Sequence, residues 1–99
     1  MKQSTLSLIE PLLDVLRSNA ALREVRPTKF LLDGSDFLHF HGEDTGVVAD
    51  VRLSRSFVRM PVSTPAEQSE LLERVGEYLD ALESHRRGRH RSGPRRREW

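Results

Sequence analysis

The chain has 99 residues, of which 31% are charged and 36% hydrophobic, and it contains no cysteine. This length allows one small domain with a single core, and the lack of cysteine excludes a disulfide framework, a thiolate metal site and a cysteine nucleophile. Residues 85–99 hold seven arginines and one glutamate, a formal charge of +6, so the total of +1 leaves −5 on residues 1–84. We therefore expect an acidic domain at residues 1–85 and a disordered, arginine-rich tail at residues 86–99.

The N-terminal segment does not have the uninterrupted apolar stretch of a signal peptide, because Glu10 and Asp14 divide it. No run elsewhere approaches the roughly 18 apolar residues of a membrane span. We expect a cytoplasmic protein that does not associate with membranes and that is a monomer or a weak dimer.

A first helix is predicted over residues 5–19, because apolar residues recur there at three- and four-residue spacing. Ser4 is a suitable N-cap for this helix. Pro11 is the one residue that disfavours it, since proline inside a helix removes a backbone hydrogen bond; the alternative is a helix that starts close to Pro11, where proline is tolerated in the first turn.

Four short strands are expected after this helix. Residues 25–32 have the β-branched and aromatic content of a strand, and Pro27 restricts that strand to a sheet edge or to a late start. Asp33-Gly34-Ser35 is a turn signal. Apolar residues then alternate with polar ones in 37–41, 47–53 and 57–62, and the polar segment 42–46 joins the first two of these runs into a hairpin.

A second helix is predicted after the strands, and its start has the clearest local signal in the chain. Thr64 is suited to the N-cap, Pro65 to the first helical position, and Glu67 completes a capping box. The helix should end near His85. The element order predicts an α+β fold with two layers: an antiparallel four-stranded sheet with both helices on one face. The core is expected to contain Leu12, Leu16, Leu38, Phe40, Val47, Ala49, Val51, Met60, Leu72, Val75 and Leu79.

The candidate site lies on the sheet face that the helices leave open. Side chains alternate between the two faces of a strand, so the apolar sets can share one face while polar residues gather on the other. The polar residues expected together are His39, His41, Asp50, Arg52 and Arg59.

Three interpretations of this group stay open. Two imidazoles and a carboxylate suit iron or another divalent metal, with Glu43 and Asp44 as spare ligands nearby. His39 or His41 could alternatively act as a general acid or base oriented by Asp50. The third interpretation is a set of polar side chains facing water, with Asp50 and Arg52 paired across strands.

The sequence FLHFHG, followed after a short gap by ADVRL, resembles the histidine-x-histidine-glycine and aspartate signature of a family of small bacterial luciferase-domain proteins, most of them uncharacterised. The likeness covers residues 37–50 and is vaguer through the second helix. It implies an α+β fold and His39, His41 and Asp50 as signature positions, and it implies little about activity.

Two functions follow from these features. We favour a non-enzymatic binding module whose open sheet face binds a protein or a small molecule and whose basic tail contacts nucleic acid, since arginines neutralise phosphates without needing a fold. The alternative is a small enzyme or metal-binding protein that uses His39, His41 and Asp50, and only this alternative requires a cofactor, a divalent metal. The predicted binding residues are Arg52, Arg59, Arg86, Arg87, Arg89, Arg91, Arg95, Arg96 and Arg97.

Overall fold

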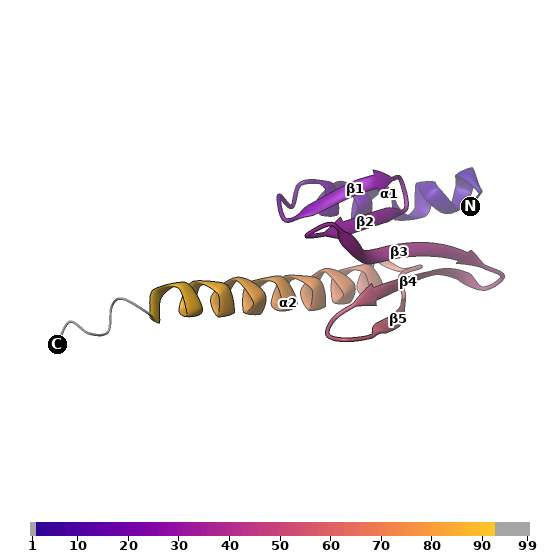
Figure 1. Cartoon of the computed structure of the whole chain (residues 1–99). Coiled ribbons are helices and arrows are strands. Elements are labelled where there is room, and N and C mark those ends of the chain that lie inside the picture. The colour runs from indigo at the N-terminus through magenta and orange to yellow at the C-terminus, as the bar shows by residue number, and fades with distance from the viewer. Residues whose placement is uncertain (1, 93–99) are drawn as a thin grey trace.

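The computed structural model describes the backbone of residues 2–92 and the side chains of residues 2–86. Five strands lie between two helices in the chain, and they form one antiparallel sheet in which each strand pairs with the next (Figure 1). This confirms the α+β class and the antiparallel sheet. The elements are α1 (Gln3–Arg17), β1 (Leu22–Arg26), β2 (Lys29–Leu32), β3 (Ser35–Glu43), β4 (Gly46–Arg52), β5 (Phe57–Pro61) and α2 (Pro65–Ser92).

The predicted number of four strands is wrong, because the stretch 25–32 forms a turn in its middle. β1 and β2 pair antiparallel, with Leu22 opposite Leu32 and Arg26 opposite Lys29. Pro27 lies between these strands, where its missing N–H group does not interrupt a ladder of hydrogen bonds. The proline therefore separates two short strands of a hairpin and does not delay the start of a single strand.

Helix α1 begins at Gln3 and ends at Arg17, two residues earlier at each end than predicted, and Ser4 is not its N-cap. Pro11 lies inside the helix. A proline there costs about 3 kcal/mol. Four apolar side chains of α1 are fully buried, each contributing about 1.5–3 kcal/mol, and this packing outweighs the proline. These side chains are Ile9, Leu12, Leu13 and Leu16.

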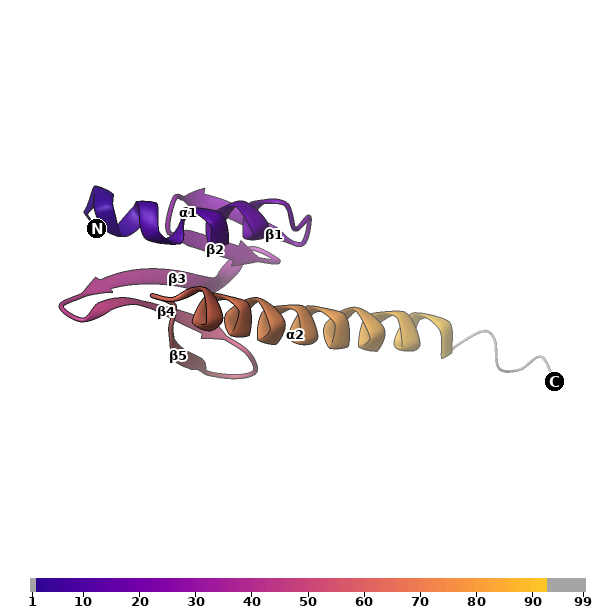
Figure 2. The same cartoon turned by 180° about the vertical axis from the view of Figure 1, so that it is seen from behind.

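Both helices lie on the same face of the sheet (Figures 1 and 2). Strand β4 shows the consequence, because Val47, Ala49 and Val51 are buried while the residues between them are partly exposed. The predicted core residues are buried except Leu72 and Leu79, which pack against the core and are partly buried. The opposite face of the sheet, which neither helix covers, is called the open face below.

Two turns fix the strands around the site. The β2–β3 turn places Asp33 at φ 55° and Gly34 at φ 81°, the left-handed conformation that Asp-Gly pairs favour in tight hairpins. Gly46 begins β4 at φ 146°, and a Cβ atom there would lie 2.1 Å from Ser63 Oγ. The Ser63 hydroxyl accepts a hydrogen bond from the backbone N–H of Val47 at 2.8 Å, so this glycine allows the start of β4 to approach the segment before α2.

Helix α2 begins with the predicted capping box. The N–H of Glu67 donates to Thr64 Oγ1, and the Glu67 carboxylate accepts from the N–H of Thr64, both at 3.1 Å. The helix continues to Ser92, so the predicted end near His85 is wrong. A glycine such as Gly88 lowers the stability of a helix by only about 1 kcal/mol relative to alanine, and arginine is a good helix former. Residues 86–92 therefore extend α2 beyond the sheet (Figure 1), whereas 93–99, the rest of the predicted tail, lie outside the described residues.

Within residues 2–92, neither helix combines the length and the apolar character that crossing a membrane requires.

Candidate binding face

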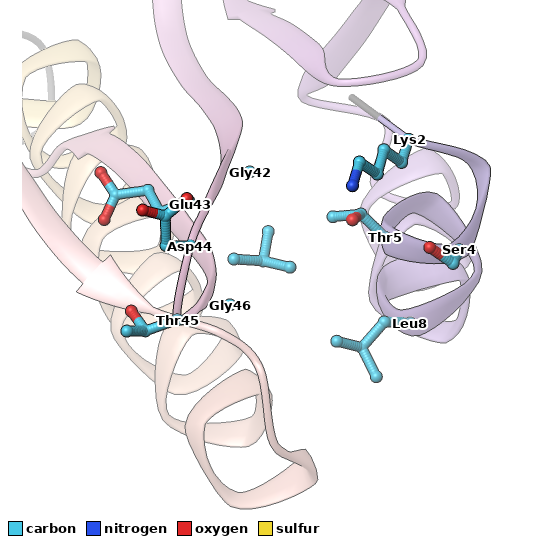
Figure 3. A pocket seen from close by; sticks show the side chains of 10 residues that line it. Lys2, Ser4, Thr5, Leu8, Gly42, Glu43, Asp44, Thr45 and Gly46 are labelled. Atoms are coloured by element: carbon cyan, nitrogen blue, oxygen red, sulfur yellow. The ribbon is translucent and has the colours of Figure 1, made fainter.

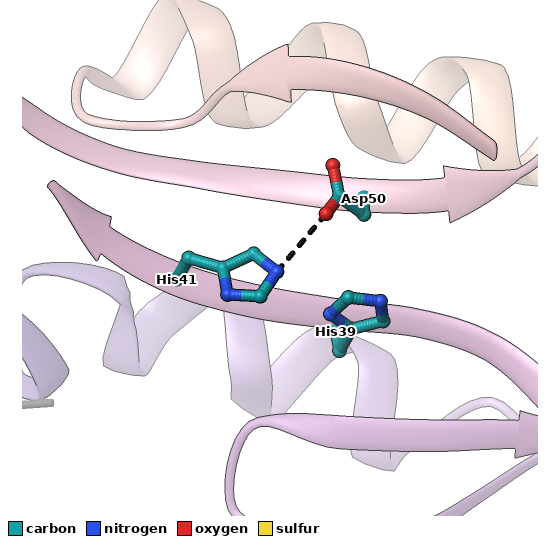
Figure 4. A group of neighbouring side chains, drawn as sticks. All are labelled: His39, His41 and Asp50. Carbon is teal, nitrogen blue, oxygen red and sulfur yellow. Dashed lines mark hydrogen bonds and ion pairs between the residues drawn. The ribbon is translucent and has the colours of Figure 1, made fainter.

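Strands β3 and β4 bring the predicted site residues together on the open face (Figure 4). His39 lies directly opposite Asp50 in the antiparallel register, and His41 follows two residues further along β3. All three side chains are partly exposed, whereas Phe40, between the two histidines in sequence, is 4% exposed on the core side. The predicted grouping of His39, His41 and Asp50 is therefore present in the structure.

Asp50 is the centre of a hydrogen-bonded network. Its Oδ2 atom lies 3.0 Å from His41 Nε2. Arg59, directly opposite on β5, donates from Nε to Oδ1 at 2.9 Å and from a terminal nitrogen to Oδ2 at 3.0 Å. The Arg59 guanidinium lowers the pKa of Asp50 below its ordinary value, and the bond from His41 acts in the same direction, while partial burial opposes both. Asp50 is therefore ionised at neutral pH.

The pairing of Asp50 with Arg52 is wrong. The two residues lie on the same strand, two positions apart, whereas Arg59 faces Asp50 across the β4–β5 ladder, where paired side chains meet. The Nε of Arg52 donates instead to the backbone carbonyl of Asp36 at 3.0 Å.

Glu43 and Asp44, which the sequence suggested as further metal ligands, do not lie with the two histidines and Asp50 among the described residues. Glu43 contacts Arg59 through an ion pair of 3.3 Å. Neither Glu43 nor Asp44 belongs to the group of potential ligand atoms that His39, His41 and Asp50 form among the described residues.

Sequence reasoning missed three cations on the open face, because it expected one strand at residues 25–32 in place of the β1–β2 hairpin. Lys29 lies opposite His39, Arg26 lies opposite Lys29, and Arg23 lies opposite Leu31. Residues that face each other across an antiparallel ladder point to the same side of the sheet, so all three cations lie on the side of His39. Reading Pro27-Thr28 as a hairpin turn would have revealed them.

The open face has a positive charge in an otherwise acidic domain. Five cations and three acids give it a formal charge of +2, whereas residues 1–84 as a whole carry −5. Among the described residues, Arg23 and Arg26 have no acidic partner. The cations are Arg23, Arg26, Lys29, Arg52 and Arg59, and the acids are Asp36, Glu43 and Asp50.

A shallow hollow of about 250 Å³ lies beside His39 on this face, with Arg26, Lys29 and Asp36 in its lining. An aromatic surface adjoins the same histidine, since the Phe57 ring lies 5.6 Å from the His39 ring and Phe57 is 45% exposed. Positively charged side chains, a shallow hollow and an exposed aromatic ring therefore lie next to one another around His39.

A larger hollow, of about 690 Å³, lies between the N-terminal turns of α1 and the β3–β4 hairpin (Figure 3). Thr5 and Leu8 line it from α1 and Lys2 from the position before this helix, while Glu43 and Asp44 line it from the hairpin. None of the grouped residues His39, His41 and Asp50 takes part in this lining, so the larger space is separate from the candidate site.

The described part of the arginine-rich segment, the backbone of residues 86–92, lies away from the open face. Arg86 forms an ion pair with Asp33 in the β2–β3 turn. Helix α2 packs on the other face of the sheet and extends away from it (Figure 2). Its last two turns include the backbone of Arg87, Arg89 and Arg91. The remaining predicted binding residues, Arg95, Arg96 and Arg97, lie outside the described residues.

No family model, curated protein or solved structure matches the chain. The resemblance of residues 37–50 to the luciferase-domain family therefore stays a prediction.

Proposed function

We propose that the protein is a non-enzymatic binding module whose open sheet face binds single-stranded nucleic acid. The observation that carries this proposal is the charge of +2 on the face that neither helix covers, in a domain of charge −5. A uniformly acidic surface would repel a polyanion, whereas cations collected on one face attract its phosphates locally.

The hollow beside His39 supports the proposal because it offers a place for a phosphate group. Arg26 and Lys29 line it. Lys29 shares its charge with Asp36 through an ion pair of 3.3 Å, whereas Arg26 is exposed and has no acidic partner within the part of the chain that is described. Arg26 is therefore the cation best placed to donate hydrogen bonds to an incoming anion.

Aromatic surface next to the cations favours a single strand over a duplex. Unpaired bases can stack on exposed rings, and such stacking is independent of sequence because every base has a π face. The exposed Phe57 ring, packed against His39, provides this surface on the same face as Arg26 and Lys29.

The C-terminal arginines form a second basic region in this proposal. Residues 86–92 belong to α2, which lies behind the sheet, so the arginines of this stretch add general attraction for the polyanion without taking part in the contacts around His39 (Figure 2). Arginines that contact only phosphate groups do not recognise bases.

The test is a fluorescence anisotropy titration of a labelled single-stranded RNA oligonucleotide with the full chain over a series of salt concentrations. Loss of one phosphate contact should reduce the slope of log affinity against log salt by about 0.7. We expect this change for Arg26→Ala and no change for Arg74→Ala, a matched control that removes the same charge from the exposed surface of α2.

A third variant separates the face from the C-terminal segment. It replaces the seven arginines between residues 86 and 97 by glutamine in the full chain. This variant should bind more weakly and remain sensitive to Arg26→Ala. If binding disappears completely in the glutamine variant, or if Arg26→Ala and Arg74→Ala behave alike, the open face is not the binding surface.

A further inference from the structure

A group of nitrogen and oxygen atoms lies at the centre of the open face. One nitrogen from each of His39 and His41 and one carboxylate oxygen of Asp50 lie within 4.8 Å of one another (Figure 4). The three side chains come from two neighbouring strands of the sheet, a rigid support for a site. Imidazole nitrogens together with one carboxylate form a ligand set that suits divalent transition metals better than calcium or magnesium.

The distance between His41 and Asp50 already fits two adjacent metal ligands. His41 Nε2 and Asp50 Oδ2 are 3.0 Å apart. Because an ionised carboxylate can only accept a hydrogen bond, the Nε2 atom carries the proton between them. If a metal replaced this proton at about 2.1 Å from both atoms, the angle at the metal would be about 90°, the angle between neighbouring ligands of an octahedron.

We infer that His39, His41 and Asp50 form a binding site for one divalent transition metal ion. Binding forms bonds from the metal to one nitrogen of each histidine and to Asp50 Oδ2. The Nε2 proton of His41 passes to water while Nδ1 takes a proton up, so His41 binds the metal as a neutral imidazole. Three protein ligands leave further coordination positions, which face solvent because neither helix covers this face (Figure 4). The inference does not rest on the proposed binding of nucleic acid.

Arg59 competes with the metal for Asp50. Its guanidinium contacts both carboxylate oxygens, at 2.9 and 3.0 Å, and its positive charge opposes a second cation nearby. Arg59 also contacts Glu43 at 3.3 Å, so it has another acidic partner when the metal takes Oδ2. Removing the guanidinium should therefore strengthen metal binding, an effect that a merely structural role of the three residues would not produce.

The test is isothermal titration calorimetry of the tag-free full chain with Zn²⁺ and with Co²⁺, in the absence of nucleic acid. We expect one ion per chain, a loss of affinity of about tenfold or more for His39→Ala and for His41→Ala, and tighter binding for Arg59→Gln. The matched control is His85→Ala combined with His90→Ala, which removes the other two histidines of the chain and should leave the affinity unchanged.

A spectroscopic measurement on the unmodified protein makes the result independent of how the variants fold. Paramagnetic Co²⁺ should broaden the NMR signals of β3 and β4 around residues 39, 41 and 50 and spare those of α2. Stoichiometric binding that persists in both histidine variants, broadening centred on His85 or His90, or no binding of either ion would overturn the inference. Because no nucleic acid is present, these outcomes leave the proposed function to its own test.

Discussion

The substitution Phe40→Ala tests the assignment of the two sheet faces, on which the candidate site depends. Phe40 lies between His39 and His41, it is 4% exposed, and it lies opposite Ala49 in the β3–β4 register. Truncating a buried phenylalanine removes its burial and leaves a cavity, at a cost of about 3–5 kcal/mol. The free energy of unfolding of a small domain is about 5–15 kcal/mol. This one substitution should therefore remove a large part of the stability.

Urea denaturation followed by circular dichroism measures this cost. With a slope of about 1 kcal/mol/M, as expected for a domain of this size, the midpoint should fall by about 3 M or more. If the Phe40→Ala protein is unfolded even without urea, Phe40→Leu can be measured in its place, because it should lower the free energy of unfolding by only about 1 kcal/mol.

The matched control is Phe57→Ala, which removes the same atoms from a side chain that is 45% exposed on the open face. Its only ring contact among the described residues is with His39, so we expect a cost below about 1 kcal/mol. An equal cost for Phe57→Ala and Phe40→Ala, or an unchanged midpoint for Phe40→Ala, would refute the face assignment. A shift of β3 by one residue would produce that result, because it moves every side chain to the other face.

Three further predictions concern contacts that hold the fold and the site. Arg17→Ala should lower the free energy of unfolding by about 1 kcal/mol, because Arg17 joins α1 to Glu24 of β1 at 2.8 Å, and urea denaturation in 1 M salt should show a smaller loss as the ion pair is screened. Thr64→Ala should cost about 1 kcal/mol in a thermal melt, because it removes the side-chain cap of α2, and a cost near zero would contradict the capping geometry. Asp50→Asn should flatten the acid limb of stability against pH. Because Arg59 lowers the pKa of Asp50 in the folded state, its carboxylate stabilises the protein above the unfolded pKa of about 3.9, and this contribution disappears as pH falls through the folded pKa. Denaturation curves between pH 2 and 6 check this, and parallel profiles for the two proteins would contradict it.

The alternation of apolar and polar residues along β3 and β4 predicted which side chains share the open face, because the alternation depends only on the local geometry of a strand. His39 and His41 flank an inward-facing phenylalanine, and Asp50 lies between two inward-facing residues, so each had to point outward once the apolar faces were joined. The capping box before α2 was equally local, since three residues at fixed spacing satisfy the free N–H groups of a helix start.

The contacts that sequence reasoning missed depend on register between strands. Arg59 faces Asp50 only because the loop after β4 sets which residue of β5 lies opposite, and no local pattern specifies that. Arg26 and Lys29 reach the open face because Pro27 divides one expected strand into two. The predicted end of α2 near His85 is wrong for another reason: the prediction assigns Gly88 to a disordered tail, yet one glycine is a weak helix breaker.

The most direct test of the proposed binding face is an NMR titration of the isotope-labelled full chain with a short single-stranded RNA. We expect the largest changes in backbone amide shifts on strands β1 to β5 around Arg26, Lys29, His39 and Phe57, and little change in α2 before residue 86. Changes confined to residues 86–99, with the strands unaffected, would contradict it.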